Sequence, residues 1–178
     1  MASEPNIETL FSSAQIAKRN EELAEQIASD LGQDILVIAV LKGSFVFAAD
    51  LIRSLHHAGV RPQIDFMALS SYGDKTISSG TVVITRDIMD TVKGRKVLLI
   101  DDILESGRTM EFARDELMSR GAETVKTCLM LDKKGKRVVD FEADFVGFDC
   151  PDLFVIGYGL DYAHYYRELP YIGHILDK

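Results

Sequence analysis

The sequence predicts an α/β fold, in which a parallel-dominated central sheet is flanked by helices. Short apolar runs recur along the 178 residues, and segments with helical spacing of apolar residues lie between them. The run over residues 35–41 is apolar on both faces, which is typical of a parallel strand covered by helices on both sides. No internal repeat and no linker rich in Ser or Gly divides the chain, so we expect one domain over residues 1–178.

The first expected elements are a helix, a strand and a second helix. Residues 7–31 repeat apolar side chains at the spacing of an amphipathic helix, and Gly32 favours its end there. The strand 35–41 leads through a tight turn into a helix over 45–55. The remaining expected elements, in chain order, are strands over 60–70, 81–84 and 97–100, a helix over about 109–120, and strands over 124–131, 145–148 and 154–157.

A polar stretch over residues 70–80 interrupts this alternation. Its side chains are small and polar, apart from Tyr72, Lys75 and Ile77. Long polar loops in compact domains are commonly disordered or act as functional lids. We therefore expect a mobile loop over these residues.

The composition excludes several classes of protein. Hydrophobic residues make up 47% of the chain, as in folded proteins, and the net charge of −8 argues against a nucleic-acid partner. The apolar runs are far shorter than the roughly 20 residues that cross a bilayer. The first five residues do not resemble a secretory signal, so we expect a cytoplasmic protein without a membrane partner. Cys128 and Cys150 lack the spacing of a zinc site and are expected to be buried thiols.

Two adjacent carboxylates, Asp101 and Asp102, follow the apolar run 97–100 and precede a turn of small residues. In open α/β sheets, ligands bind at the carboxyl ends of the strands. The carboxylates can accept hydrogen bonds from a vicinal diol, and the turn over 105–109 can direct backbone N–H groups at a phosphate. A ribose 5-phosphate fits this pair of sites. Taken alone, the two aspartates could also form a solvated turn that caps the following helix.

Residues 97–109 closely resemble the phosphoribosyl-pyrophosphate (PRPP) signature of the type I phosphoribosyltransferases: four apolar residues, two acidic, two apolar, an acidic or small residue, a small residue, Gly, any residue, Thr. That signature leaves the acceptor base open. Further segments, over 41–44, 70–73, 131–133 and 146–170, resemble the hypoxanthine-guanine phosphoribosyltransferases in the same order. The resemblance extends over about residues 15 to 175.

The resemblance implies a PRPP site built from three segments. Asp101 and Asp102 would face the ribose hydroxyls, directly or through Mg²⁺. Lys42 and Gly43 would hold the pyrophosphate, and the peptide bond between them is often cis in this family. Arg167 would meet the departing pyrophosphate. The 5-phosphate would be bound by Glu105, Ser106, Gly107, Arg108 and Thr109, and the loop residues that would close over the site are Ser71 and Tyr72.

The resemblance also implies the purine site. Lys133 would donate to the 6-oxo group, Phe154 would stack on the base, and the backbone of Val155 would meet its pyrimidine edge. Asp161 would lie beside the purine site and bind Mg²⁺. An ammonium can only donate, so it favours a carbonyl and rejects the amino group of adenine. Without the resemblance, Phe154 would be assigned to the core, and the basic residues from Lys133 to Arg137 to a solvated turn.

The chain departs from the family pattern at Glu105, because the family usually carries Asp at this position. In the family, the residue at this position accepts the proton from purine N7. The resemblance therefore implies that Glu105 is a catalytic group together with Lys133 and Arg167. Glu has a similar reference pKa, about 4.3 against 3.9, but its side chain is one methylene longer.

The expected reaction transfers the phosphoribosyl group of PRPP to hypoxanthine or guanine. A small hood from the N- and C-terminal segments would cover the purine, and the chain would form a homodimer or homotetramer, as the resemblance implies. Two alternatives stay open: a PRPP-binding regulator on the same fold, and a phosphoribosyltransferase that prefers xanthine.

Overall fold

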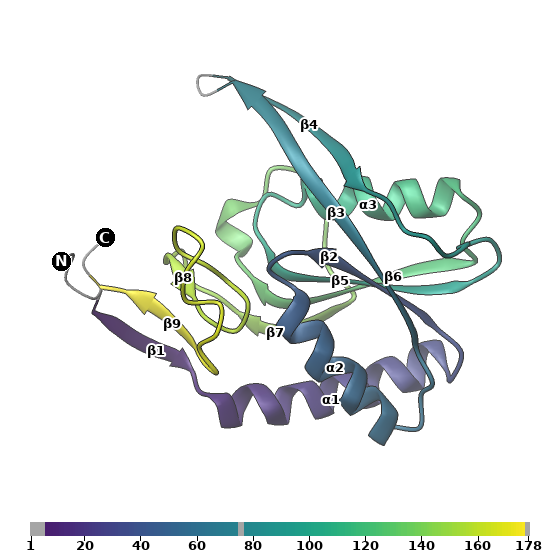
Figure 1. Cartoon of the computed structure of the whole chain (residues 1–178), viewed down its shortest axis with the longest axis horizontal. Helices are drawn as coiled ribbons and strands as arrows, with labels where there is room; N and C mark the ends of the chain where they lie inside the picture. Colours follow the sequence, from purple (N-terminus) through teal and green to yellow (C-terminus); the bar gives the residue numbers. More distant parts are fainter. Residues whose placement is uncertain (1–5, 75–76, 177–178) are drawn as a thin grey trace.

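The computed structural model describes residues 6–74 and 77–176, with the backbone alone described for 71–74 and 77–80. The predicted α/β class is confirmed (Figure 1). The helices and strands, in chain order, are β1 (Ile7–Phe11), α1 (Ser13–Leu31), β2 (Leu36–Leu41), α2 (Phe45–His57), β3 (Gln63–Asp74), β4 (Ile77–Arg86), β5 (Lys96–Leu104), α3 (Arg108–Ser119), β6 (Thr124–Asp132), a short 3₁₀ helix (Lys134–Lys136), β7 (Phe145–Asp149), β8 (Val155–Ile156) and β9 (Ile172–Ile175).

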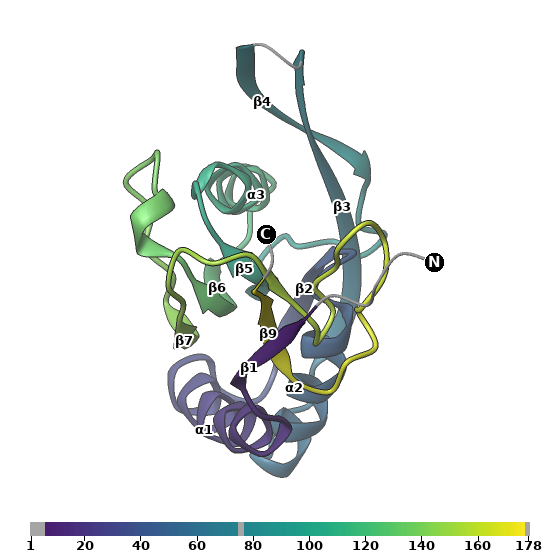
Figure 2. The same ribbon diagram turned by 90° about the vertical axis from the view of Figure 1, so that its left-hand side faces the viewer.

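The central sheet has six strands in the order β4-β3-β2-β5-β6-β7. All neighbouring strands are parallel except β3 and β4, which pair antiparallel. Helices α1 and α2 cover one face of the sheet and α3 covers the other (Figures 1 and 2). Because β2, β5 and β6 are adjacent and parallel, their carboxyl ends lie together on the same side of the sheet. An α/β protein binds its ligands at this side.

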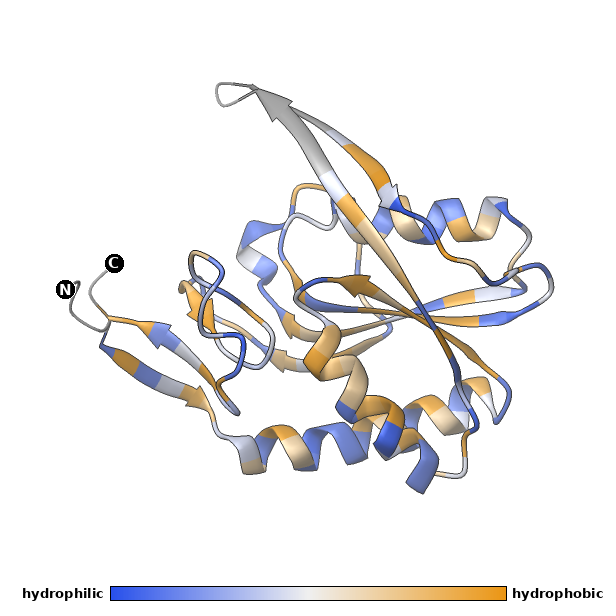
Figure 3. Ribbon diagram, viewed as in Figure 1, coloured by the Kyte–Doolittle hydropathy of each residue, from blue (hydrophilic) through white to orange (hydrophobic). Residues whose placement is uncertain are grey.

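Strand β2 shows why its run of apolar residues has no polar face. Val37 and Ala39 pack in the core beneath α1 and α2, whereas Leu36 and Ile38 pack in a second core beneath α3. All four side chains are fully buried, and the hydropathy colouring shows the central strands as apolar (Figure 3). A strand with helices on both faces must be apolar at every position. Cys128 and Cys150 are free and buried, as predicted.

The predicted helix over 7–31 is wrong at its start, because Ile7–Phe11 forms strand β1 and the helix begins only after Ser12. Ser12 accepts a hydrogen bond from the backbone N–H of Gln15 at 3.3 Å, and the Gln15 side chain accepts one from the Ser12 backbone at 2.9 Å. This reciprocal capping box fixes the first turn of the helix.

Strand β1 pairs with β9, and β8 pairs with the other edge of β9, so the two ends of the chain form a separate three-stranded sheet. Figure 2 shows this small sheet in front of the central one. It is made of the N- and C-terminal segments that the sequence assigned to a hood.

The predicted loop over 70–80 is wrong in its secondary structure, because β3 continues to Asp74 and β4 begins at Ile77. Ser71 pairs with Val82 and Tyr72 with Thr81 in an antiparallel ribbon that projects from the body (Figure 1). The two strands satisfy each other's backbone hydrogen bonds, so the ribbon needs no apolar side chains. Residues 75–76 lie outside the described part of the chain.

Strand β5 is also longer than the predicted 97–100, because its pairing with β6 continues to Leu104. Asp101 and Asp102 therefore lie within the C-terminal half of the strand rather than after it.

In the described part of the chain, no helix is long and apolar enough to cross a membrane.

Candidate functional site

The predicted site residues gather at the carboxyl ends of neighbouring strands. Lys42 follows β2, Asp101 and Asp102 lie near the end of β5, and Lys133 follows β6. Because β2, β5 and β6 are adjacent in the sheet, these side chains share one edge of it. The segment after β8 reaches the same edge, since an added Cβ on Gly159 would lie 2.1 Å from the carbonyl oxygen of Gly43.

Asp102 lies directly against Gly43. An added Cβ on Gly43 would lie 1.6 Å from Oδ2 of Asp102, so only glycine fits at this position. Burial, followed by the charge of Asp102, raises the pKa of Asp101 well above its ordinary value. Burial also raises the pKa of Asp102, and the positive charge of Arg167 opposes that rise. Burial thus disfavours the charged form of both carboxyl groups, and a bound cation or hydroxyl donor would stabilise that form.

The cis peptide bond of this region joins Leu41 to Lys42. The bond expected from the resemblance, between Lys42 and Gly43, was therefore placed one residue too late. The Lys42 side chain is exposed at the end of β2.

The turn over residues 105–109 leads from β5 into α3. Gly107 has a φ of +85°, and an added Cβ would lie 2.9 Å from Cγ2 of Val139 and 3.1 Å from Cβ of Phe141. Glycine is therefore required both by its conformation and by the packing around it. A cavity of about 150 Å³ opens at this turn, lined by Asp101, Ile103, Leu104, Glu105, Ser106, Gly107, Thr109 and Met110.

Lys133 and Glu105 form an ion pair, with 2.7 Å between Nζ and Oε1. The Lys133 side chain is only 8% exposed, whereas that of Glu105 is 50% exposed. A buried ammonium needs a partner of this kind. Lys134 and Lys136 point outward and pair with exposed carboxylates, so only those two lysines behave as a solvated basic turn.

Sequence reasoning missed the role of Arg137, which it placed in the solvated turn. Its guanidinium pairs with the buried Asp132 at 2.5 Å and donates to the backbone carbonyl of Glu105 at 2.7 Å. The backbone N–H of Val138 donates to Ser106 at 2.9 Å. The segment after β6 therefore holds the turn over 105–109 in place. The sequence carried no signal for this role, because it did not show the partners of the basic residues.

Asp161 and Arg167 are paired with each other at 2.6 Å. The second carboxylate oxygen of Asp161 accepts a hydrogen bond from the backbone N–H of His164 at 2.8 Å. Arg167 also donates to the carbonyl of Gly159 at 2.5 Å, and Gly159 packs on Gly43. These contacts bring the two residues to the Lys42 and Gly43 segment.

Phe154 is 41% exposed, so it does not have the burial of a core residue. Its ring lies edge-on to that of Tyr162, with 5.6 Å between centroids and 78° between planes. Val155, the next residue, is buried in β8. This arrangement presents an aromatic surface at the edge of the small sheet. The side chains of Ser71 and Tyr72 lie outside the described part of the structure.

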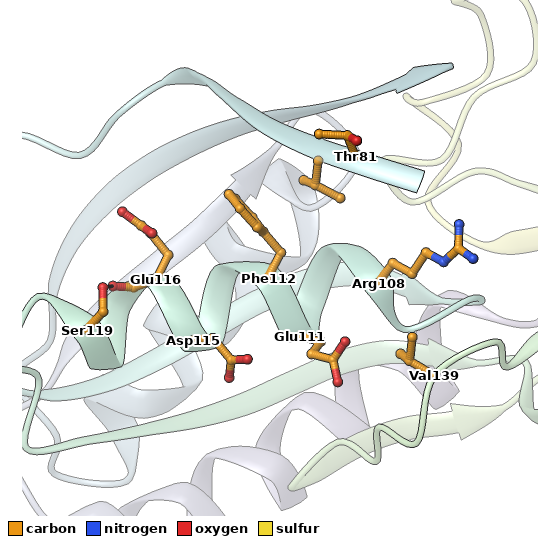
Figure 4. A pocket seen from close by; sticks show the side chains of 9 residues that line it. Thr81, Arg108, Glu111, Phe112, Asp115, Glu116, Ser119 and Val139 are labelled. Atoms are coloured by element: carbon orange, nitrogen blue, oxygen red, sulfur yellow. Dashed lines mark hydrogen bonds between the residues drawn. The ribbon is translucent and has the colours of Figure 1, made fainter. Parts of the chain in front are cut away.

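A second cavity, of about 610 Å³, lies between β4 and α3 (Figure 4). Of the predicted site residues, only Arg108 lines it. Its wall also carries Glu111, Asp115 and Glu116, together with Phe112 (Figure 4). Three carboxylates would repel a phosphorylated substrate. This cavity shares no lining residue with the one at the 105–109 turn, so the two are separate.

Comparison with known proteins points to one family. The model of the phosphoribosyl transferase domain matches residues 6–163. The hypoxanthine-guanine phosphoribosyltransferase of Bacillus subtilis is 46% identical over 165 residues, which are 92% of this chain and 90% of that protein. A crystal structure of the Bacillus anthracis hypoxanthine-guanine phosphoribosyltransferase is 44% identical, with a TM-score of 0.90, over 97% of this chain and 100% of that chain. A structure of the Trypanosoma cruzi hypoxanthine phosphoribosyl transferase is 37% identical, with a TM-score of 0.91, over 98% of this chain and 94% of that chain. It comes from work on the role of the C-terminal region in the oligomeric state and enzymatic activity of that protein.

Proposed function

The chain belongs to the hypoxanthine-guanine phosphoribosyltransferases, which transfer the 5-phosphoribosyl group of PRPP to hypoxanthine or guanine, and we propose how the residues of its site perform this step. The enzyme serves purine salvage, and its products are inosine or guanosine monophosphate and pyrophosphate. In the reaction, the bond between C1′ and the pyrophosphate oxygen breaks and a bond from purine N9 to C1′ forms. The pyrophosphate leaves with the electron pair, and the purine loses one proton.

The pairing of Lys133 with Glu105 carries the proposal for the purine site. The 6-oxo oxygen and N7 are neighbours on the edge of a 6-oxopurine. A lysine donor beside a carboxylate acceptor matches that edge, because the lysine donates to the oxygen while the carboxylate accepts the N7 proton. Phe154 supplies the aromatic surface for the base, and the backbone of Val155 meets its pyrimidine edge.

The turn over 105–109 binds the 5-phosphate in our proposal. Its cavity of about 150 Å³ suits a small group, and the N-terminus of α3 opens onto it. Asp101 and Asp102 accept hydrogen bonds from the ribose hydroxyls. Ser106 and Thr109, which line this cavity, add hydroxyl donors, whereas the Arg108 side chain lines the separate cavity between β4 and α3.

Lys42, Gly43 and Arg167 would hold the pyrophosphate as its negative charge develops. We propose Mg²⁺ as the cofactor, held by Asp161, with Asp101 and Asp102 near the ribose. Among the described residues, no three His, Cys, Asp or Glu side chains converge on one point. Mg²⁺ usually takes one or two carboxylates with substrate phosphates and waters, so this donor set fits it. When bound, Mg²⁺ supplies charge neutralisation at the pyrophosphate.

We expect Lys133→Ala to raise the KM for hypoxanthine by about 10–200-fold, the scale for losing a charge-assisted contact. The KM for PRPP should rise less, because Lys133 does not contact PRPP in this proposal. The measurement is nucleotide formation with hypoxanthine, guanine, xanthine and adenine in turn, with and without PRPP and Mg²⁺. The parent enzyme should use the first two bases, and the same series tests a preference for xanthine.

Lys134→Ala is the matched control for that variant, because Lys134 is the next residue but its side chain is 70% exposed. We expect its KM values to match those of the parent. If Lys134→Ala raised the KM for hypoxanthine and Lys133→Ala did not, the purine site would be displaced by one residue. A parent enzyme that bound PRPP without forming nucleotide would favour the regulator instead.

We propose that the β3–β4 ribbon closes over the site and excludes water that would hydrolyse PRPP. Two-stranded ribbons of small polar residues are marginally stable alone. Amide hydrogens over 70–74 and 77–80 should therefore exchange quickly in the free enzyme and slowly with PRPP and Mg²⁺ bound. Strong protection without ligand would contradict a closing ribbon.

We also propose that the small sheet is the hood over the purine, within one domain over residues 1–178. The homodimer or homotetramer is a proposal from the resemblance, and the Trypanosoma cruzi relative is one whose oligomeric state has been examined. The substrates are small molecules, so we expect no nucleic-acid or membrane partner. A cytoplasmic location remains a prediction of the sequence.

A further inference from the structure

Tyr158 is a buried tyrosine with no part in the reaction described so far. Its side chain is 4% exposed, and its hydroxyl lies between α1 and α2. The hydroxyl accepts a hydrogen bond from Nδ2 of Asn20 at 2.8 Å and donates one to Oδ2 of Asp50 at 2.7 Å. Asn20 is 2% exposed on α1, and Asp50 is on α2. The hydroxyl therefore joins the segment after β8 to both helices.

The backbone at Tyr158 is in an unusual conformation. Gly157, Tyr158 and Gly159 have φ values of +91°, +53° and +99°. A non-glycine residue rarely adopts such a value unless its surroundings enforce it. The two hydrogen bonds of the hydroxyl, together with a bond from the Tyr158 backbone N–H to Leu169 at 2.9 Å, supply that enforcement.

This turn is also the support for the pyrophosphate end of the site. Gly159 packs so closely on Gly43 that an added Cβ would lie 2.1 Å from the Gly43 carbonyl oxygen. The Gly159 carbonyl accepts from the Arg167 guanidinium at 2.5 Å, and its N–H donates to the Arg167 carbonyl at 3.0 Å. A shift of the turn would thus move Arg167 and release its contact with the Gly43 segment.

We propose that Tyr158 is a positioning residue for pyrophosphate binding, acting through Gly159 on Arg167 and on the Lys42 and Gly43 segment. This inference rests on the proposed function, in which those residues hold the pyrophosphate. Burial and the neighbouring Asp50 raise the pKa of Tyr158, so its hydroxyl keeps the proton that it donates.

Tyr158→Phe tests this inference because it removes only the hydroxyl. We expect the Kd for pyrophosphate and the KM for PRPP to rise about five- to tenfold, while the KM for hypoxanthine stays within about twofold of the parent. The affinity for pyrophosphate would be measured by calorimetry on the full chain with Mg²⁺, and the KM values by steady-state assay.

Thr127→Val is the control for lost stability. The Thr127 hydroxyl is also buried and donates a hydrogen bond to Asp144 at 3.1 Å. It lies near the start of β6, six residues before Lys133, and so away from the strand end that carries the site. This variant should lower the melting temperature without changing pyrophosphate affinity. If Tyr158→Phe folds poorly, Asn20→Ala removes one of the two bonds and should change pyrophosphate affinity in the same direction by a smaller factor.

Arg167→Ala separates the inference from the proposal on which it rests. If Arg167→Ala left pyrophosphate affinity unchanged, the proposed pyrophosphate site would be wrong. If Arg167→Ala weakened that affinity but Tyr158→Phe behaved as Thr127→Val does, Tyr158 would serve stability alone and the inference would be overturned. Equal losses for hypoxanthine and pyrophosphate in Tyr158→Phe would overturn it as well.

Discussion

Asp161→Asn is expected to lower turnover by about 10²–10³-fold, the cost of removing one preorganised electrostatic contact from a reacting centre. Asparagine keeps the shape of the side chain and can still accept the hydrogen bond that the His164 backbone donates to Asp161. It removes the charge that pairs with Arg167 and that would hold Mg²⁺. The Mg²⁺ concentration for half-maximal rate should therefore rise. The measurement is a Mg²⁺ titration of turnover at saturating PRPP and hypoxanthine.

Asp152→Asn is the control for a lost ion pair, because Asp152 is exposed and pairs with Lys136 on the surface. Its turnover and Mg²⁺ dependence should equal those of the parent. If Asp161→Asn kept the Mg²⁺ dependence of the parent but lost affinity for pyrophosphate, Asp161 would orient Arg167 and bind no metal.

The sequence predicted the central sheet well because its evidence is local. A strand buried on both faces is apolar at every position, and residues 35–41 show this pattern directly. Strand β1 was missed because its partner β9 lies more than 150 residues further along the chain. Helical spacing over 7–31 continued through this strand by chance. The Ser12 and Gln15 capping box was the one local signal that the helix begins later.

The resemblance predicted the residues of the candidate site, but it did not predict which of them contact one another. The resemblance assigned Lys133 and Glu105 to the purine site, but it did not indicate that they are paired. Arg137 and Tyr158 act through partners that are distant in sequence, so no motif indicated them. The predicted position of the cis peptide bond was wrong by one residue. A resemblance between segments identifies the segment, but it does not fix the conformation of a single bond within it.

Glu105→Gln should lower turnover in the direction of nucleotide synthesis by about 10²–10⁴-fold, the usual contribution of a general base. Glutamine keeps the length of the side chain but cannot accept the N7 proton. The affinity for PRPP should change little, because Arg137 binds the backbone carbonyl of Glu105 and not its side chain. Turnover and PRPP affinity would be measured on the same preparation, with the melting temperature as a check, since the buried Lys133 loses its anionic partner.

Glu105→Asp separates the reach of this carboxylate from its chemistry. Glu105 lies 2.7 Å from Lys133 and aspartate is one methylene shorter, so Glu105→Asp should lose this contact unless the turn over 105–109 moves toward Lys133. The turn resists such a shift, because Gly107 is packed against Val139 and Phe141. We therefore expect Glu105→Asp to keep the base but to lose part of the turnover, between the parent and Glu105→Gln. Near-normal turnover in Glu105→Gln would remove the base assignment, and the carboxylate would then serve only to neutralise Lys133.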